Sequence, residues 1–364
     1  MSHDWDAIVI GGGPAGSTVA RYAAKAGAKV LVIDRREKIG TPLQCGELVP
    51  TNKELKRLCP NVPDIDDLFQ TPDEAISRFT KTMGIVSPSG NRLEYPFEGQ
   101  ILNRPIHDQR LVYLAKKEGA QYSTKSRVND VIGNEVILKN GERISAKIIV
   151  GCGGPHDILR KKFWNESSLN IAVNFVLMDG DFMDRVDLFF GSIAPGGYAW
   201  MIPKEGGANI GIGIQTRFSK NKSLNQRAED FFSKFEGEIT YKGGGVLPMS
   251  GTISNFVKGN YMLVGDSAGM VLPSNGAGIT TAMTGGRIAG QAIGNYINHG
   301  TTINDYQKNW NKQMGNEMKY SKRGIWWGGL MFRSPDWLIN AGFNRMTKSM
   351  IWRAITCKPM FHIL

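Results

Sequence analysis

Residues 6–17 read Asp-Ala-Ile-Val-Ile-Gly-Gly-Gly-Pro-Ala-Gly-Ser, and this stretch predicts how the first part of the chain folds. Its apolar start is typical of a strand buried in a parallel sheet. Gly11, Gly13 and Gly16 then form the pattern G-x-G-x-x-G, and an alanine-rich stretch that predicts a helix follows. In such a turn the first glycine permits a tight bend, the second lets the backbone approach a pyrophosphate, and the third lets helix and strand pack closely.

A second apolar strand is predicted at 30–33, and it ends at Asp34, 18 residues after Gly16. An acid at this point can accept hydrogen bonds from a ribose hydroxyl, and the N-terminus of the helix offers free N–H groups to a pyrophosphate. The pattern therefore predicts a dinucleotide site. A second glycine cluster at 151–154 lacks the third-glycine spacing and an acid-ending strand, so a separate NADPH domain is not expected. This favours FAD as a resident cofactor.

The length of 364 residues allows two ordinary domains, or one large α/β domain with an insertion. No run approaches the roughly 20 apolar residues that cross a bilayer, and the first strand begins within a few residues of the N-terminus, so a cytoplasmic protein is expected. The four cysteines, Cys45, Cys59, Cys152 and Cys357, show no C-x-x-C or metal-ligand spacing. Neither disulfides nor a metal site is expected.

The net charge of +11 is concentrated near the C-terminus, where residues 308–364 hold ten Lys/Arg against two acids and five of the eight tryptophans. Such a region can bind nucleic acid or an anionic membrane surface, or it can simply be a solvated basic face. The tryptophan, phenylalanine and methionine side chains among the charges favour a lipid partner over nucleic acid.

Hydrophobic periodicity predicts how the rest of the chain is organised. A helix is expected at 103–119, a strand at 120–131 and a glycine-rich helix at 276–298, whereas 169–248 alternates as strands do. We predict an α/β fold in which residues 1–168 and 249–298 form a Rossmann-like FAD-binding domain. A sheet-based substrate domain at 169–248, with parts of 51–100, is inserted in it, and 299–364 form a basic, aromatic helical region.

A second motif lies at 263–282, Leu-Val-Gly-Asp-Ser-Ala-Gly-Met-Val-Leu-Pro-Ser-Asn-Gly-Ala-Gly-Ile-Thr-Thr-Ala. Asp266 at the end of a strand can hold ribityl hydroxyls. Gly276 and Gly278, at the start of a helix, can bring backbone N–H groups to the O2 edge of a flavin, where charge develops on reduction. Over most of residues 5–298, including Arg104 and the helix that follows, the chain resembles flavoproteins of the p-hydroxybenzoate-hydroxylase type.

Two further motifs narrow this resemblance. The segment 195–203, Pro-Gly-Gly-Tyr-Ala-Trp-Met-Ile-Pro, is similar to the P-x-x-Y-x-W-x-F-P signature of geranylgeranyl reductases, with Ile202 in place of phenylalanine. Gln-Cys-Gly-Glu at 44–47 resembles the C-G-E loop of the archaeal members, which saturate the isoprenoid chains of digeranylgeranyl glycerophospholipids. One departure is Gly153-Gly154, where the superfamily has Asp-Gly, although Arg160 still matches.

The resemblance also implies which residues contact FAD. They are Ala15 at the pyrophosphate turn, Asp34 at the ribose, Cys45, Gly46 and Leu48 beside the isoalloxazine, Arg104 near the ribityl phosphate, Val128 at the adenine, and Asp266, Gly278 and Ile279 completing the site.

An isolated alkene needs a hydride from the flavin and a proton held in near-attack geometry. Our hypothesis is that Cys45 delivers the proton or shapes the alkene site, the alternative being that it only packs on the flavin. Tyr198 and Trp200 face one side of a strand and are assigned to the wall of an apolar substrate tunnel, the alternative being sheet core. Glu47 is interpreted as a solvated loop acid rather than a proton relay.

The expected partners are a prenylated lipid, a membrane surface that the C-terminal helices contact peripherally, and an electron donor: ferredoxin, reduced deazaflavin or NADPH. Three other functions stay open. They are reduction of another prenyl substrate such as a chlorophyll or quinone tail, FAD-dependent aromatic monooxygenation, and non-catalytic FAD-dependent membrane binding.

Overall fold

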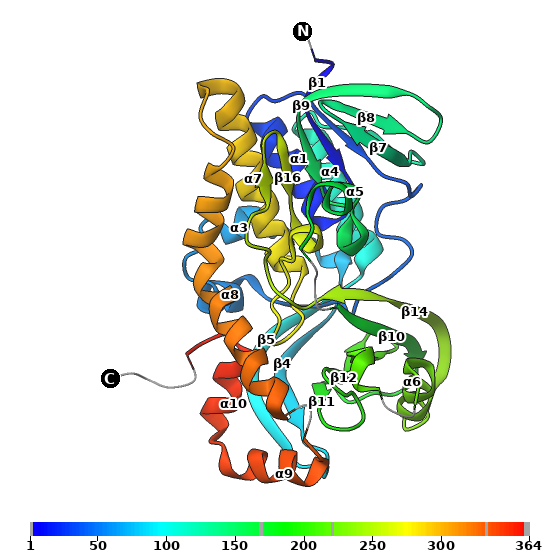
Figure 1. Cartoon of the computed structure of the whole chain (residues 1–364). Helices are drawn as coiled ribbons and strands as arrows, with labels where there is room; N and C mark the ends of the chain where they lie inside the picture. Colours follow the sequence, from blue (N-terminus) through cyan, green and yellow to red (C-terminus); the bar gives the residue numbers. More distant parts are fainter. Residues whose placement is uncertain (1–2, 167–169, 220–221, 332–333, 360–364) are drawn as a thin grey trace.

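The computed structural model describes residues 3–166, 170–219, 222–331 and 334–359. The strands form two eight-stranded sheets, one in the upper and one in the lower half of the molecule in Figure 1. Helices pack on both sheets, and the chain passes from one sheet to the other several times. This architecture confirms the predicted α/β fold with a Rossmann-like half.

The first sheet has the order β15-β16-β9-β1-β2-β6, with β8 pairing on β9 and β7 on β8. Its strands are β1 (Trp5–Ile10), β2 (Val30–Ile33), β6 (Gln121–Ser123), β7 (Val128–Ile132), β8 (Glu135–Leu138), β9 (Arg143–Gly151), β15 (Val257–Lys258) and β16 (Tyr261–Leu263). The pairings of β1 with β2 and β9, of β2 with β6 and of β9 with β16 are parallel. The central strands are buried apolar runs because helices cover the sheet.

The strand predicted at 120–131 is two strands, β6 and β7. Lys125, between them, has a backbone φ of 56° in the left-handed region, where a strand cannot continue. Its N–H donates to the carbonyl of Arg36, and the N–H of Ser126 donates to the carbonyl of Asp34. The break therefore brings the chain beside the end of β2.

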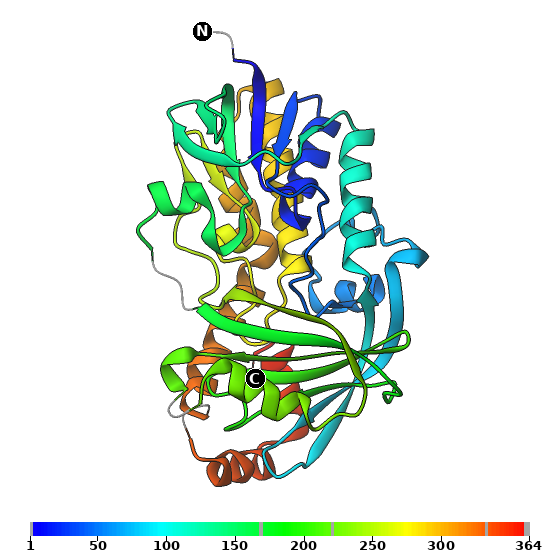
Figure 2. The ribbon, with the colours of Figure 1, turned by 90° about the vertical axis from the view of Figure 1, so that its right-hand side faces the viewer.

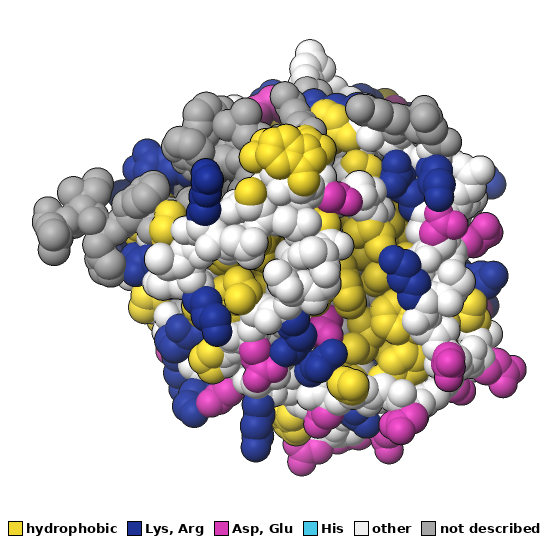
Figure 3. All heavy atoms as spheres, turned by 90° about the horizontal axis from the view of Figure 1, so that it is seen from below, with side chains coloured by type: hydrophobic (Ala, Val, Ile, Leu, Met, Phe, Trp, Pro, Cys, Tyr) yellow, Lys and Arg dark blue, Asp and Glu magenta, His cyan; other side chains and the backbone are white. Residues whose placement is uncertain are grey.

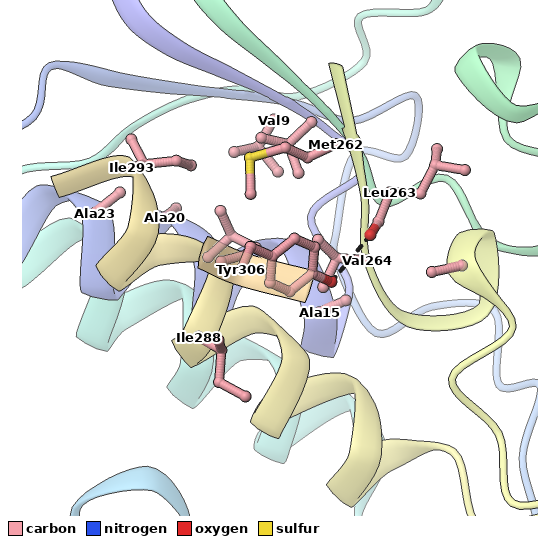
Figure 4. Close-up of a cluster of buried hydrophobic side chains, with 14 of the residues drawn as sticks. Val9, Ala15, Ala20, Ala23, Met262, Leu263, Val264, Ile288, Ile293 and Tyr306 are labelled. Atoms are coloured by element: carbon pink, nitrogen blue, oxygen red, sulfur yellow. Dashed lines mark hydrogen bonds between the residues drawn. The ribbon is translucent and has the colours of Figure 1, made fainter. Parts of the chain in front are cut away.

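The helices on the first sheet are α1 (Pro14–Lys25), α4 (Arg104–Lys117), α5 (Ile158–Phe163), α7 (Ile279–His299) and α8 (Asp305–Met331). A Cβ atom on Gly286 or Gly290 of α7 would lie 2.7 or 2.6 Å from a backbone oxygen of α1, so these glycines permit the close approach of the two helices. Figure 4 shows the core beside them, where Tyr306 of α8 donates a hydrogen bond of 3.0 Å to the carbonyl of Leu263.

The second sheet has the order β14-β10-β13-β12-β11-β4-β5-β3. Its strands are β3 (Leu48–Pro50), β4 (Ile76–Val86), β5 (Arg92–Leu102), β10 (Asn170–Asp179), β11 (Val186–Phe189), β12 (Tyr198–Lys204), β13 (Gly207–Ile214) and β14 (Glu238–Pro248). Figure 2 shows β4 and β5 of this sheet running from their turn near the bottom of the molecule up toward α4. The short helices α2 (Asn52–Leu58) and α3 (Ile65–Leu68) lie between β3 and β4 along the chain.

Different helices cover the two faces of the second sheet. On one face α6 (Leu224–Phe232) buries Ala228 and Phe231 against β12 and β13. Its N-terminus carries a reciprocal capping box between Ser223 and Gln226. On the other face, α9 (Asp336–Arg345) and α10 (Lys348–Ile355) contribute apolar side chains to the cluster that contains Trp200. Strand alternation sends consecutive residues of β12 into these two clusters.

The C-terminal region is more deeply packed than the expected lipid-facing helices. Trp310 is fully buried in the core of the first sheet, and Trp352 stacks on Tyr95 of the second sheet with ring centroids 4.8 Å apart. For these two tryptophans the expectation of lipid contact is wrong, because they complete the two cores. Trp337 on α9 is 70% exposed. The side chains of Trp326 and Trp327 lie outside the described residues.

No helix in the described ranges has the length and apolar character needed to span a membrane.

Candidate active site between the two sheets

In the glycine-rich turn after β1, backbone atoms fill the space beside Gly11 and Gly16, whereas the space beside Gly13 is open. A Cβ atom on Gly11, whose φ is 103°, would collide with the carbonyl of Cys152, and one on Gly16 would collide with the carbonyl of Gly11. Gly13 is the N-cap of α1, and a Cβ there would meet only the Arg36 guanidinium, at 3.9 Å. The turn therefore fits a pyrophosphate at the helix N-terminus.

Asp34 at the end of β2 is buried, and both of its carboxylate oxygens accept hydrogen bonds. Its oxygens accept hydrogen bonds from the backbone N–H groups of Gly12 (2.7 Å) and Arg36 (2.8 Å) and from the Arg36 guanidinium. Burial alone would raise the pKa of Asp34, but these donors hold it below its ordinary value. A ribose hydroxyl would share this carboxylate with Arg36, and the contact of Asp34 with a ribose stays a prediction.

Two further predicted contacts, Ala15 and Val128, adjoin the segments that follow β16 and β2. A Cβ on Gly265 would lie 2.8 Å from that of Ala15, so Ala15 adjoins the turn that carries Asp266. Val128 begins β7, directly after the segment that bonds to the backbone of Asp34 and Arg36. The structure thus brings the predicted pyrophosphate and adenine contacts to one edge of the first sheet.

A buried charged cluster lies at the opposite end of the predicted cofactor site. Arg104 at the start of α4 donates to both oxygens of Asp108, at 3.0 and 2.9 Å. Burial opposes ionisation of Asp108, but Arg104 lowers its pKa to about 2. Burial raises the pKa of Asp266 to about 6, although the positive charge of Arg104 acts to lower it.

Asp266 also lies beside the opening of α7. Its Oδ1 is 3.7 Å from the position that a Cβ of Gly278 would take. Gly278 is the N-cap of α7 and Ile279 is its first residue, so free N–H groups of the helix and the carboxyl group of Asp266 share one corner. The carboxyl group of Asp266 suits the hydroxyls of a ligand, and the N–H groups of the helix suit a negative charge that develops on it.

The Cys45 loop lies against β12 and β13. The N–H of Glu47 donates to Sγ of Cys45 at 3.1 Å, and Nδ2 of Asn209 donates to the carbonyl of Cys45 at 2.9 Å. The loop continues into β3, whose Leu48 pairs with the end of β5. Burial raises the pKa of the Cys45 thiol, although Arg104 acts in the opposite direction. The thiol is therefore protonated at neutral pH.

Tyr198 and Trp200 face the same side of β12, with ring centroids 6.0 Å apart. The Tyr198 hydroxyl donates to the carbonyl of Asn275 at 2.6 Å, and Nε1 of Trp200 donates to Oδ1 of Asn209 at 2.9 Å. Trp200 is buried in the hydrophobic cluster below the Cys45 loop, whereas Tyr198 is partly exposed at its edge. Gly46 lies against β12 of the second sheet, because a Cβ there would be 3.3 Å from Ile202 and 3.5 Å from Nε1 of Trp200.

The C-terminal helices hold the loop that precedes α7. Ser321 of α8 accepts a hydrogen bond from the N–H of Ser274 at 2.9 Å, and Nδ2 of Asn275 donates to the carbonyl of Ile355 in α10 at 2.9 Å. Since Tyr198 binds the same asparagine, this loop joins the C-terminal helices to the strand that carries Tyr198 and Trp200.

The structure gives a reason why Gly153-Gly154 stands here in place of the Asp-Gly of the superfamily. Asp157 is the N-cap of α5, and its carboxylate accepts hydrogen bonds from the N–H groups of Gly153 (2.7 Å) and Arg160 (3.1 Å). A Cβ on Gly153 would lie 2.8 Å from this carboxylate. The carboxylate of Asp157 thus fills the space that a side chain at 153 would need, and Arg160 still donates to the carbonyl of Ser267.

The expectation that Glu47 is a solvated loop acid is wrong. Its side chain is 1% exposed and forms a 2.6 Å ion pair with Lys204 at the end of β12. Nδ2 of Asn209 donates to the same carboxylate oxygen at 3.2 Å. Lys204 and Asn209 were absent from the predicted site, because an isolated lysine and an isolated asparagine carry no local signal of a contact so distant along the chain.

Comparison with known proteins agrees with the fold and the family that the sequence motifs indicate. A model of the geranylgeranyl reductase catalytic domain matches residues 168–246, and a model of an NAD(P)-binding Rossmann-like domain matches 9–55. Digeranylgeranylglycerophospholipid reductase 3 of Methanosphaera stadtmanae is 34% identical over 323 residues, which cover 80% of this chain and 78% of the relative. The corresponding reductase of Methanosarcina acetivorans is 32% identical over 355 residues, covering 88% and 84%.

Solved structures agree with these relatives. A geranylgeranyl bacteriochlorophyll reductase-like protein from Thermoplasma acidophilum superposes with a TM-score of 0.83 and 26% identity, covering 96% of this chain and 95% of the other. A flavin-dependent brominase superposes with a TM-score of 0.73 at 18% identity, covering 98% and 94%, and this likeness shows the fold alone. Together with the motifs at 44–47 and 195–203, these similarities show that the chain belongs to the geranylgeranyl reductase family, among the digeranylgeranylglycerophospholipid reductases.

Proposed function

We propose that the protein is an FAD-dependent reductase that saturates the C=C bonds of geranylgeranyl chains in archaeal-type membrane glycerophospholipids. The observation that carries the proposal is the meeting of three features at the junction of the two sheets. These are the protonated Cys45 thiol, the corner formed by Asp266 and the N-terminus of α7, and the aromatic face of β12. Relatives with 32–34% identity are named for this activity.

The residues of the first sheet fit FAD. The open side of the turn at Gly13 admits a pyrophosphate, Asp34 and Arg36 offer a carboxylate and a guanidinium to the adenosine end, and Arg104 and Asp266 offer opposite charges at the other end. Ala15, Gly46, Leu48, Val128, Gly278 and Ile279 keep their predicted roles as FAD contacts. When bound, FAD supplies the hydride that an alkene without a polarising carbonyl requires.

Cys45 holds the proton in this proposal. Its raised thiol pKa keeps the proton on Sγ at neutral pH, and the hydrogen bond from the N–H of Glu47 orients the sulfur. Tyr198 and Trp200 position the chain of the substrate on the apolar face of β12, and the surrounding hydrophobic side chains exclude water.

The test is anaerobic incubation of the dithionite-reduced protein with digeranylgeranylglyceryl phosphate, followed by mass spectrometry. We expect product masses to rise by two hydrogens for each reduced double bond. Cys45→Ser should retain FAD but lose turnover by about 10²–10⁴-fold, the range of general acid catalysis. Cys59→Ser, on the partly buried thiol next to α2, is the control and should keep its activity. Full turnover by Cys45→Ser would remove the catalytic role of Cys45, and an oxygenated product formed in air with NADPH would indicate a monooxygenase.

We also propose that the protein binds peripherally to a membrane from which a lipid tail enters. Trp337 and Leu338 on α9 are 70% and 44% exposed. Figure 3 shows a strip of hydrophobic side chains on the face of the molecule seen from below, bordered by both basic and acidic side chains. An exposed apolar strip suits a lipid surface, and the excess of Lys and Arg in residues 308–364 suits an anionic one.

Replacing both Trp337 and Leu338 with alanine is expected to weaken binding to vesicles of anionic glycerophospholipid by roughly tenfold or more, because two large side chains lose their apolar burial. Co-sedimentation measures this, and reduction of a detergent-solubilised substrate should be unchanged. Met183→Ala, which removes another exposed hydrophobic side chain, is the matched control. Equal vesicle binding by the double variant and the wild type would count against membrane contact through α9.

The electron donor is proposed to be ferredoxin, reduced deazaflavin or NADPH. Anaerobic rates of flavin reduction with each donor in turn distinguish the three.

A further inference from the structure

Glu47 is an acid in an unusual environment. Its backbone φ is 68°, in the left-handed region, and its side chain is buried between the Cys45 loop and the second sheet. Oε2 accepts hydrogen bonds from Nζ of Lys204 and Nδ2 of Asn209, whereas the buried Oε1 has no hydrogen-bond partner among the described residues. A buried carboxylate oxygen without a donor is costly. It is also a free position at which this group can take up a proton.

Lys204 connects this buried acid to the surface. Its ammonium group forms the 2.6 Å ion pair with Glu47, and its side chain is 17% exposed. Lys204 also lines a surface hollow of about 270 Å³, together with Arg78, Gly180, Asp181, Phe182, Gly206 and Gly207. One lysine therefore contacts both the solvent in the hollow and the carboxylate beneath it.

Glu47 contacts Cys45 through its backbone, and its carboxylate acts on the thiol electrostatically. The N–H of Glu47 bonds to Sγ of Cys45 at 3.1 Å. Burial raises the pKa of the thiol, Arg104 lowers it, and the Glu47 carboxylate adds to the rise. The other charged or titratable groups around the thiol are Tyr198 of β12 and, through Arg104, Asp108 and Asp266. Glu47 is the group near the thiol that Lys204 joins to the hollow.

We propose that Lys204 and Glu47 form a proton-supply route that leads from the hollow beside the β12–β13 turn to Cys45. The inference rests on the proposed function, in which each double bond takes up one hydride and one proton. A thiol that has given its proton to a substrate carbon is left as a thiolate and must be protonated again before it can act on the next double bond. A substrate with several double bonds requires this recharging repeatedly.

The steps balance as simple proton transfers. The Cys45 S–H bond breaks as the new C–H bond forms, which leaves a thiolate beside the ionised Glu47. The Lys204 ammonium then gives a proton to the Glu47 carboxylate, and the carboxyl O–H formed in this way passes its proton to the thiolate. Water in the hollow restores the ammonium. The hydride carries the electron pair of the reduction, so no residue of the route is oxidised or reduced.

The first test separates proton supply from simple positioning of the loop. Glu47→Gln keeps the size of the side chain but cannot carry a proton. Lys204→Arg keeps the positive charge but does not release a proton near neutral pH. In rapid-quench experiments with pre-reduced protein, both variants should reduce the first double bond at nearly the wild-type rate and slow at least tenfold afterwards. Glu98→Gln, which removes the acid of an exposed 2.6 Å ion pair with Lys53, should show no such burst.

The second test needs no turnover. The alkylation rate of Cys45 by iodoacetamide, followed on the Cys45 peptide by mass spectrometry, reports the pH at which the thiol ionises. Glu47→Gln should shift this midpoint to lower pH, because the carboxylate that opposes the thiolate is gone, whereas Glu98→Gln should not.

Three results would overturn the route. They are an unchanged alkylation midpoint, loss of the first turnover in Glu47→Gln, which would make Glu47 a positioning residue only, and wild-type multiple turnover in Lys204→Arg. A wild-type protein that reduces no prenyl chain would refute the proposed function instead, and the alkylation midpoint would still measure whether Glu47 acts on Cys45.

Discussion

Replacing Arg104 with methionine is expected to lower the free energy of unfolding by about 3–5 kcal/mol, because a buried acid then loses its guanidinium partner and keeps only the 3.3 Å contact with Nδ1 of His107. The side chains of Arg104 and Asp108 are 14% and 1% exposed, and two hydrogen bonds join them. Chemical denaturation at neutral pH measures the loss. Arg143→Met breaks the exposed ion pair with Glu135, which is also 2.9 Å long, and should cost only about 0–1 kcal/mol.

The effect of Arg104→Met should depend on pH in a defined direction. The pKa of Asp108 is lowered to about 2 in the folded protein, against an ordinary value of about 3.9 in an unfolded chain. A lowered folded-state pKa contributes stability that is complete above the unfolded value and is lost as the pH falls through the folded one. The difference between wild type and variant should therefore be largest above about pH 4 and shrink toward about pH 2. Equal losses for Arg104→Met and Arg143→Met at neutral pH would contradict the importance of the buried pair.

The second large effect is expected from Gly16→Ala. The new Cβ would collide with the carbonyl oxygen of Gly11, so α1 must move away from the turn that presents its N–H groups. Overpacking of this kind costs about 1–3 kcal/mol or more, and we expect the purified variant to contain no FAD and to resist reconstitution. Flavin absorbance per protein measures the occupancy, and circular dichroism shows whether the chain is folded.

Gly245→Ala is the matched control for this substitution. Gly245 lies in β14, and a Cβ there would meet no atom within 4 Å. This variant should bind FAD as the wild type does. Normal FAD content in Gly16→Ala would show that the glycine-rich turn is not where the dinucleotide binds.

The first sheet was predictable from the sequence because its signals are local. The spacing of Gly11, Gly13 and Gly16 fixes a turn, and the flanking apolar runs fix the strands on either side. The same local reading missed α6, because residues 224–232 lie within a long stretch that alternates as strands do. It also joined β6 and β7, since a single left-handed residue, Lys125, leaves no mark on the hydrophobic pattern.

The second sheet and the burial of Glu47 depend on contacts between residues that lie far apart in the sequence. β4 pairs with β11 in parallel, about a hundred residues later, and no turn signal announces such a pairing. Glu47 is buried because Lys204 meets it across 157 residues of sequence. The charge and tryptophan content of the C-terminal region predicted a surface role, but composition does not distinguish an indole that faces solvent from one, such as Trp310, that fills a core.

The burial of Trp310 also determines what a shortened chain would do in a cell. Deleting everything after residue 307 would remove the indole from the centre of the first sheet and the serine that anchors the loop before α7. The remainder would expose apolar surface, which cellular proteases and chaperones recognise. The truncated protein should therefore be degraded and should not accumulate as an active enzyme that no longer binds lipid. A premature stop codon in α8 should act as a complete loss of function.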